Sequence, residues 1–195
     1  FENTRLGLYT CITAQGDETH PLVMDITFDL EPNLPELPKI GITAEIPACY
    51  NSIQWFGRGP HESYPDRRAG AFLGRYEDSP ASLEVPYIVP QENGNRLDVR
   101  SIRLSGDHVP EGKPRSITII PAEPVHMSAG RYTQENLWKA LHTCDLVDIS
   151  YGTNGYYFLN IDRAQRGIGT ATCGPDTLEQ YRVRPGIFRI RLYIY

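Results

Sequence analysis

The feature of the sequence that most constrains its fold is an alternation of apolar and polar side chains with a period of two residues. The alternation runs through Leu22–Leu30 and Lys39–Ile46, and it returns at the end of the chain in Phe188–Ile194. Successive side chains of a β-strand point to opposite faces of a sheet, so each stretch is predicted to be a strand with one face in a core. Stretches of this kind at both ends of the chain indicate a protein built around β-sheets.

Other segments extend this pattern to most of the chain. Further strands are expected at Arg5–Thr13, Asn51–Phe56, Ala71–Tyr76, Arg96–Leu104, Arg115–Ile120 and Gly155–Asp162. Pro and Gly clusters, notably Glu31–Pro38 and His108–Pro114, separate these segments. Strands do not alternate with helices, which argues against a parallel α/β sheet, and the short spacing favours an antiparallel sandwich or barrel.

One segment is predicted to be a short helix. Thr133 can cap it, and Leu137, Trp138 and Leu141 are predicted to share one face. The sequence therefore predicts an all-β fold, a large antiparallel β-sandwich with one short helix, as a single domain over residues 1–195. A chain of this length can bury such a core without disulfides or metals.

Charge and cysteine content argue against several classes of function. The net charge is −5 and the pI is near 5.5, so the chain has no net attraction for nucleic acid. No apolar run approaches the ~20 residues that span a membrane. Arg far outnumbers Lys, which favours planar Arg–carboxylate pairs at a surface or interface. The four Cys show no CxxC spacing, so we expect free thiols in a reducing compartment, with no zinc site.

The segment that follows the predicted strand Asn51–Phe56 is the densest in polar and aromatic residues. Its part Arg58–Arg68, called the first loop below, is turned by Gly and Pro. It presents Arg58, His61, Glu62, Tyr64, Asp66 and Arg67. A His beside a Glu can serve as acid and base in sugar chemistry. The alternative, which the residues alone favour, is an Arg–carboxylate network that holds the loop in place.

Two further loops stand out. Pro86–Arg96, the second loop, contains Glu92, Asn93 and Arg96. Amides and Arg suit sugar hydroxyls, but Asn-Gly is also an ordinary turn, and a structural role is favoured. Gly167–Asp176, the third loop, lacks the Gly-Lys-Ser/Thr ending of a phosphate loop. Cys173 has no local base to activate it, so we expect this loop to bring backbone close to a ligand or another domain.

These loops carry ordered motifs. Trp55–Arg67 reads W-x-G-x-G-P-x-E-x-Y-x-D-R, and Pro86–Arg96 reads P-Y-x-x-P-x-E-N-G-N-R. Both motifs resemble signatures of the C-terminal domain of the large β-galactosidases of glycoside hydrolase family 2. Ser128–Thr133, Leu159–Asp162 and Gly167–Pro175 continue the resemblance in the same order. It covers about Lys39 to Tyr195, most of the chain, and several ordered motifs make it specific.

The resemblance implies a β-sandwich of the galactose mutarotase type that packs against a (β/α) barrel. In that family the barrel holds both catalytic glutamates of a retaining hydrolysis of terminal β-galactosides such as lactose. No catalytic residue and no metal ligand is then expected in this chain, and Mg²⁺ and Na⁺ belong to other domains. The family is typically cytosolic and oligomeric. The implied partners are the remaining domains or a large subunit, and the β-galactoside itself. The chain begins with Phe1, and we expect it to be the C-terminal part of such an enzyme.

The resemblance also assigns roles to residues of the loops. It places the tip of the third loop, Thr172, Cys173 and Gly174, near the substrate. It makes the residues named in the first and second loops mainly structural or interdomain: Arg58, His61, Glu62, Tyr64, Asp66, Arg67, Glu92, Asn93 and Arg96. Some family members carry a Trp in the third loop that stacks on the sugar beyond the galactose. Cys173 falls at about that position, so a smaller, backbone-lined subsite is expected.

The residues are also compatible with two other functions. One is a free-standing aldose mutarotase that uses His61 or His126 with a carboxylate such as Glu62. The other is a carbohydrate-binding module with no catalytic role. A chain that is one domain of a larger galactosidase is expected to be inactive by itself, whereas a mutarotase would be active alone.

Overall fold

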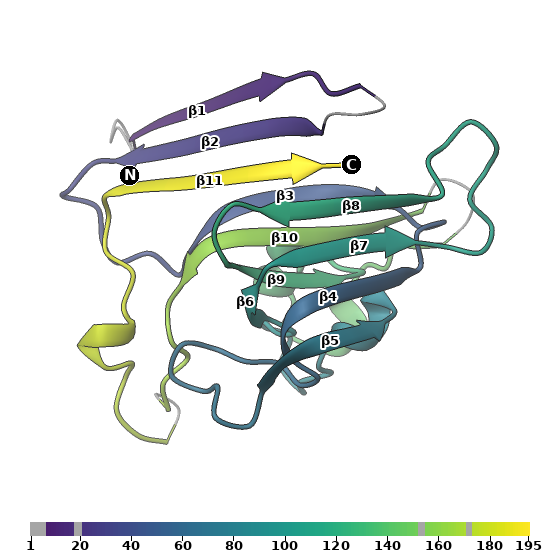
Figure 1. The fold of residues 1–195 in the computed structure, drawn as a ribbon. Helices are drawn as coiled ribbons and strands as arrows, with labels where there is room; N and C mark the ends of the chain where they lie inside the picture. Colours follow the sequence, from purple (N-terminus) through teal and green to yellow (C-terminus); the bar gives the residue numbers. More distant parts are fainter. Residues whose placement is uncertain (1–6, 18–20, 152–154, 171–172) are drawn as a thin grey trace.

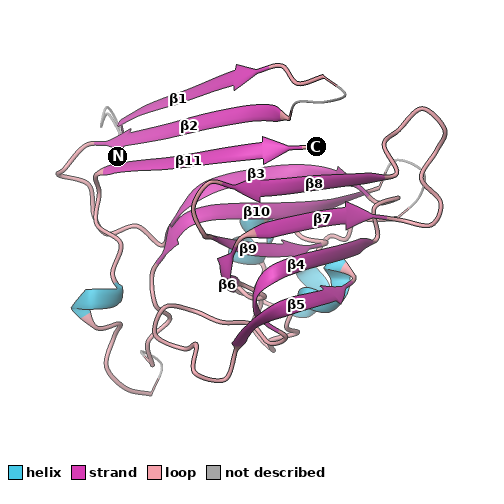
Figure 2. Ribbon diagram, in the orientation of Figure 1, coloured by secondary structure: helices cyan, strands magenta, loops and turns pink. Residues whose placement is uncertain are grey.

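The computed structural model describes residues 7–17, 21–151, 155–170 and 173–195. These residues form strands almost throughout, with short helical segments in the connections (Figure 2). The strands are β1 (Gly7–Ala14), β2 (Leu22–Leu30), β3 (Lys39–Pro47), β4 (Ser52–Gly59), β5 (Phe72–Asp78), β6 (Arg96–Val99), β7 (Ser101–Ser105), β8 (Ser116–Pro121), β9 (Val125–Gly130), β10 (Tyr156–Gln165) and β11 (Ile187–Ile194). The helical segments are the 3₁₀ turns η1 (Pro80–Leu83), η2 (Thr143–Asp145) and η3 (Glu179–Tyr181) and the α-helix α1 (Gln134–Lys139).

The strands form two sheets, which face each other (Figure 1). One sheet has seven strands in the order β1-β2-β11-β8-β7-β4-β5, and the other has four in the order β3-β10-β9-β6. The paired strands within each sheet are antiparallel. The predicted all-β antiparallel sandwich is confirmed.

Alternating side chains build the core between the sheets, as the sequence predicted. In β4 the residues at every second position, beginning with Ile53 and Trp55, are buried, and their neighbours are only half-buried. In β11, Ile190 and Leu192 are buried, and Ile190 lies opposite the buried Ile26 of β2. Period-two alternation thus corresponds to one core-facing side of each strand.

One strand prediction was wrong, and one strand was missed. The stretch Arg96–Leu104, predicted as one strand, forms β6 in the four-stranded sheet and β7 in the seven-stranded sheet. The chain changes sheets between Val99 and Ser101, where Arg100 N donates to Phe56 O at 2.8 Å, and Asp98 just before this point has a φ of 55°. The central strand β9 was missed, although its short sequence Val125–Gly130 alternates and places Val125, Met127 and Ala129 in the core.

The predicted helix exists, but its predicted apolar face is only partly correct. Thr133 caps α1, and its Oγ1 accepts from Asn136 N at 3.0 Å. Leu137 is buried, whereas Trp138 is 88% exposed. The helix ends at Lys139, so Leu141 lies beyond it and is also exposed.

A layer of loops covers the outer face of the four-stranded sheet (Figure 1). The central strand β10 is consequently buried on both faces: Leu159 and Ile161 face the core, and Phe158, Asn160 and Asp162 alternate with them. The segment between β5 and β6, which includes η1 and the second loop, contributes to this cover through contacts with β9. The covering layer brings together the loops that the sequence singled out.

Candidate functional site

The first loop is joined to the second through the carboxylate of Glu62, whose side chain is only 6% exposed. Oε1 of Glu62 accepts from Arg67 Nη2 at 2.7 Å and from the Tyr87 hydroxyl. Oε2 accepts from the backbone N–H of Gly94 at 2.9 Å and from the Tyr64 hydroxyl at 3.3 Å. Both oxygens of Glu62 are therefore engaged, which gives this carboxylate a structural role.

Backbone hydrogen bonds reinforce the junction of these two loops. Ser63 N donates to Asn95 O at 2.7 Å, and Asn95 Nδ2 donates to Ser63 O at 2.7 Å. Ser63 Oγ also accepts from Leu97 N at 3.1 Å. Tyr64 is fully buried beside this pair, and burial raises the pKa of its hydroxyl. The Tyr64 phenol thus stays protonated and serves the packing of the junction.

Two arginines fix the flanks of these loops. Arg58 Nε donates to Asp98 Oδ2 at 2.6 Å, and its Nη1 donates to Ala71 O at 2.8 Å. Arg96 is buried, lies over the ring of Trp55 at 5.6 Å and donates to a backbone carbonyl of the second loop. Burial lowers the pKa of the Arg96 guanidinium. The predicted Arg–carboxylate network is present, and Arg96 extends it by cation–π contact.

The remaining candidates of the second loop also make internal contacts. Asn93 Oδ1 accepts from Val85 N at 2.9 Å, and its Nδ2 donates to Gln91 O at 2.9 Å. Gly94 has a φ of 72°, and a Cβ there would lie 2.6 Å from Leu83 O, so glycine is required. Asn93-Gly94 therefore lies in a loop that passes close to the backbone of Leu83, and it does not form the hairpin turn that this dipeptide often forms.

Glu92 belongs to an ionic cluster around the buried Asp162 that sequence reasoning missed. Lys39 Nζ lies 3.1 Å from Glu92 Oε2 and 3.6 Å from Asp162 Oδ2. The Asp162 side chain is 4% exposed, and burial raises its pKa to about 6, although Lys39 opposes the shift. Gly41 lies beside it, since a Cβ there would be 2.2 Å from Asp162 Oδ1. The available signal was Asp162, a charged residue at the end of the largely apolar predicted strand Gly155–Asp162.

A second ionic cluster was also missed. Arg131 Nη2 lies 2.7 Å from Glu84 Oε2, and Arg131 Nη1 lies 3.2 Å from Asp148 Oδ2. The Arg131 guanidinium also lies 5.1 Å from the centre of the Tyr132 ring. Arg131 thereby links the end of η1 to the segment after α1. Its place in the motif Ser128–Thr133 was the sequence feature that could have marked this cluster.

The third loop contacts the first at its base. Asp66 Oδ1 accepts from Ile168 N at 3.0 Å, and Asp66 Oδ2 accepts from Gly169 N at 2.8 Å. Within the loop, Thr170 O accepts from Cys173 N at 2.9 Å and from Gly174 N at 2.7 Å. Asp66 therefore bridges two loops that are about a hundred residues apart in the sequence.

The tip of the third loop is open to solvent where the structure describes it. Cys173 and Gly174 are exposed, and Thr172 lies outside the described residues. The loop's far end is held by Asp176, which pairs with Arg166 at 3.0 Å. The backbone N–H of Thr177 and then Arg166 lower the pKa of the Asp176 carboxyl. The third loop thus has an anchored base, and the residue at position 173 of its exposed part is a cysteine and not an aromatic residue.

The histidines do not form the acid–base pair of the mutarotase alternative. His61 is exposed, and the carboxylate oxygens of its neighbour Glu62 are occupied by other donors. His126 is a strand residue of β9 whose pKa is lowered to about 4 by burial. Its Nδ1 is buried without a hydrogen-bond partner among the described residues. Glu62 is therefore not available to orient His61, and no hydrogen bond to Nδ1 orients the ring of His126 for acid–base catalysis.

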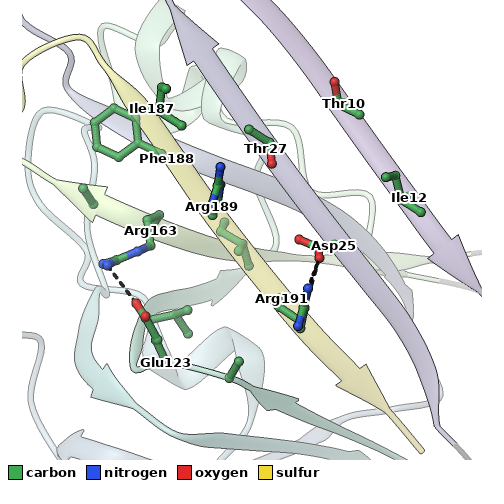
Figure 3. A pocket seen from close by; sticks show the side chains of 14 residues that line it. Thr10, Ile12, Asp25, Thr27, Glu123, Arg163, Ile187, Phe188, Arg189 and Arg191 are labelled. Carbon is green, nitrogen blue, oxygen red and sulfur yellow. Dashed lines mark hydrogen bonds and ion pairs between the residues drawn. The ribbon is translucent and has the colours of Figure 1, made fainter.

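A cavity lies away from these loops, between β11, β2 and the turn after β8 (Figure 3). It measures about 840 Å³. Among the charged side chains that line it, Arg163 pairs with Glu123 at 2.9 Å and Arg191 pairs with Asp25 (Figure 3). None of the candidate site residues lines it.

Residues 7–17, 21–151, 155–170 and 173–195 contain no group of three or more His, Cys, Asp or Glu residues placed to hold a metal ion. They also contain no helix long and apolar enough to cross a membrane. Cys11, Cys49, Cys144 and Cys173 are free thiols, as predicted.

Comparison with known proteins gives one consistent result. Residues 12–194 match the family described as beta galactosidase small chain. A β-galactosidase of Vibrio cholerae is 40% identical over 148 residues, which is 76% of this chain and 12% of that protein. Relatives from Aeromonas hydrophila and Kluyveromyces lactis, both named β-galactosidase, are 33% and 32% identical over 95% and 83% of the chain. The chain spans 16% and 14% of the length of these two proteins.

Proposed function

The chain belongs to the β-galactosidase small-chain family, and we propose that it is a non-catalytic domain of a larger retaining β-galactosidase. In this proposal the domain completes the wall of a substrate site that lies mainly in a (β/α) barrel elsewhere in the enzyme. The reaction is the hydrolysis of terminal β-D-galactosides such as lactose. The partners are the remaining domains or a large subunit.

The observation that carries the proposal is the construction of the third loop. Its base is anchored to the first loop by Asp66, while Cys173 and Gly174 at its tip are exposed. An anchored loop with an exposed tip is suited to contact a ligand held by a neighbouring domain. Because Cys173 is small, the contact beyond the galactose is a backbone-lined subsite and not an aromatic platform.

The carboxylates of the loops support a role without catalysis. Glycoside hydrolysis needs one carboxylate as acid and base and a second as nucleophile, both directed at the glycosidic bond. Glu62 and Asp66 instead accept hydrogen bonds from the protein with both of their oxygens. The two catalytic glutamates therefore belong to another part of the enzyme in this proposal. Mg²⁺ and Na⁺ are likewise bound there, and the enzyme is a cytoplasmic homo-oligomer.

The proposal is tested in the full-length galactosidase that contains this chain. Removal of the tip residues Thr172–Gly174 should raise the KM for lactose by about tenfold, the effect of losing one or two contacts. A matched control is Asp25→Asn, which alters an ion pair on β2 away from the loops. Unchanged kinetics for lactose after removal of the tip would contradict the proposed contact.

A further inference from the structure

Asp66 lies in a turn that is fixed on both sides. Tyr64 N donates to Arg67 O at 3.0 Å, and Arg67 N donates to Tyr64 O at 2.9 Å. Tyr64 is buried, and the hydroxyl of its side chain reaches Glu62 in the junction with the second loop. The backbone on either side of Asp66 is therefore tied to the body of the domain.

The Asp66 carboxylate reaches from this turn to two consecutive backbone groups of the third loop. Each of its oxygens accepts one N–H, from Ile168 at 3.0 Å and from Gly169 at 2.8 Å. Hydrogen bonds to an ionised acceptor are roughly twice as strong as neutral ones. Two parallel bonds also fix an orientation, because a single bond would leave the loop free to rotate about it.

The glycines of the third loop are shaped to receive this carboxylate. A Cβ on Gly167 would lie 2.5 Å from Oδ2 of Asp66, so only glycine allows the approach. Gly169 has a φ of 62°, which directs its N–H to the same acceptor in a conformation that favours glycine. The close fit at Gly167 is independent of the hydrogen bonds and indicates the same contact.

Beyond the base, the loop is closed on itself. Thr170 O accepts from Cys173 N and from Gly174 N, and Thr170 N donates to Pro175 O at 3.3 Å. On the opposite side of the base, Thr177 is buried, and its Oγ1 donates to Gly167 O at 2.6 Å. Cys173 and Gly174 are thus hydrogen-bonded to Thr170, the residue after Gly169, so a change at Asp66 is transmitted to Cys173.

We propose that Asp66 is the positioning residue of the third loop, the group that sets where the tip stands relative to the substrate. This inference rests on the proposed function, because it assigns the placement of the same substrate-facing loop. Asp66 touches no reacting atom in this account. It acts through Ile168 and Gly169, and its removal should weaken substrate binding more than turnover.

The contact itself is tested in the 195-residue chain by hydrogen exchange of single backbone amides. Asp66→Asn keeps the shape but removes the charge, and Gly167→Ala displaces the carboxylate without altering it. Each change should speed exchange at Ile168 and Gly169 by about tenfold, the effect of one lost hydrogen bond. The double variant should exchange no faster than Asp66→Asn, because both changes break one contact. The control Asp25→Asn should leave these amides unchanged, and unaltered exchange in both loop variants would overturn the inference.

The placement of the tip is tested in the full-length galactosidase. Asp66→Asn and Gly167→Ala should each raise the KM for lactose several-fold and leave kcat within about twofold, since they misplace a binding wall. Equal KM values for these variants and the wild type would overturn the inference. Removal of Thr172–Gly174 separates the two proposals: if it raises KM while Asp66→Asn does not, the proposed function stands and the positioning role fails.

Discussion

Glu62 and Asp162 are both buried carboxylates under the loop layer, yet the protein stabilises them by different means. Glu62 accepts from Arg67, Tyr87, Tyr64 and the N–H of Gly94. Asp162 relies on Lys39 at 3.6 Å, and its Oδ2 has no hydrogen-bond partner among the described residues. Several donors stabilise Glu62. In contrast, the single cation Lys39 stabilises both Asp162 and Glu92. The comparison teaches that burial alone does not define the role of a carboxylate; the number of its donors does.

The largest expected effect comes from removing the single cation of the Asp162 cluster. Lys39→Met should lower the free energy of unfolding by about 3 kcal/mol at pH 7, because Asp162 and Glu92 would face each other without a countercharge. Urea denaturation measures the change. Lys139→Met, at an exposed pair with Glu135 on α1, is the matched control and should leave the unfolding midpoint unchanged. A loss no larger than in the control would break the comparison.

A second prediction concerns pH. Asp162 has a pKa of about 6 in the folded protein against an ordinary value of 3.8, so the folded state binds more protons than the unfolded state between these values. The stability of the wild type should therefore fall relative to Asp162→Asn as the pH rises from about 4 to about 6, by up to about 3 kcal/mol. Denaturation of both proteins across this range measures the difference. A stability difference that is constant with pH, or that grows in favour of the wild type, would contradict a raised pKa of the buried Asp162 carboxyl.

The smallest effect is expected at Glu62 when only one donor is lost. Tyr87→Phe removes one hydroxyl, and Glu62 keeps its other donors. The free energy of unfolding should fall by about 1 kcal/mol, the usual value of one hydrogen bond. A loss as large as that of Lys39→Met, measured under the same conditions, would show that Glu62 also depends on a single partner.

The sequence predicted the sandwich because its strands carry their own signal. The alternation in Leu22–Leu30 and in Phe188–Ile194 marks the strands β2 and β11, which pair as neighbours. The split of Arg96–Leu104 between the two sheets was not predictable. The left-handed conformation of Asp98 does not change the alternation of apolar and polar residues in the sequence. The strand β9 does alternate, with Val125, Met127 and Ala129 in the core, but it is short and contains the small residues Ser128 and Gly130, and sequence reasoning missed it.

The candidate site was predictable only where motifs mark it. The motifs identified Glu62 and Asp66, but the partners of these residues lie far along the chain, at Gly94 and Gly169. The cluster around Lys39 joins segments separated by more than a hundred residues, and no local pattern connects them. Contacts of this kind depend on how the loop layer packs over β10, which periodicity does not encode.

The central claim is that the chain builds part of a galactosidase site and holds no catalytic pair of its own. The most direct test is the hydrolysis of a nitrophenyl β-galactoside by the purified chain, by the rest of the enzyme's polypeptide, and by the two mixed. We expect no turnover by the chain alone and more turnover from the mixture than from the rest of the polypeptide alone. Measurable turnover by the chain alone, abolished by a substitution in one of its own carboxylates, would contradict the account.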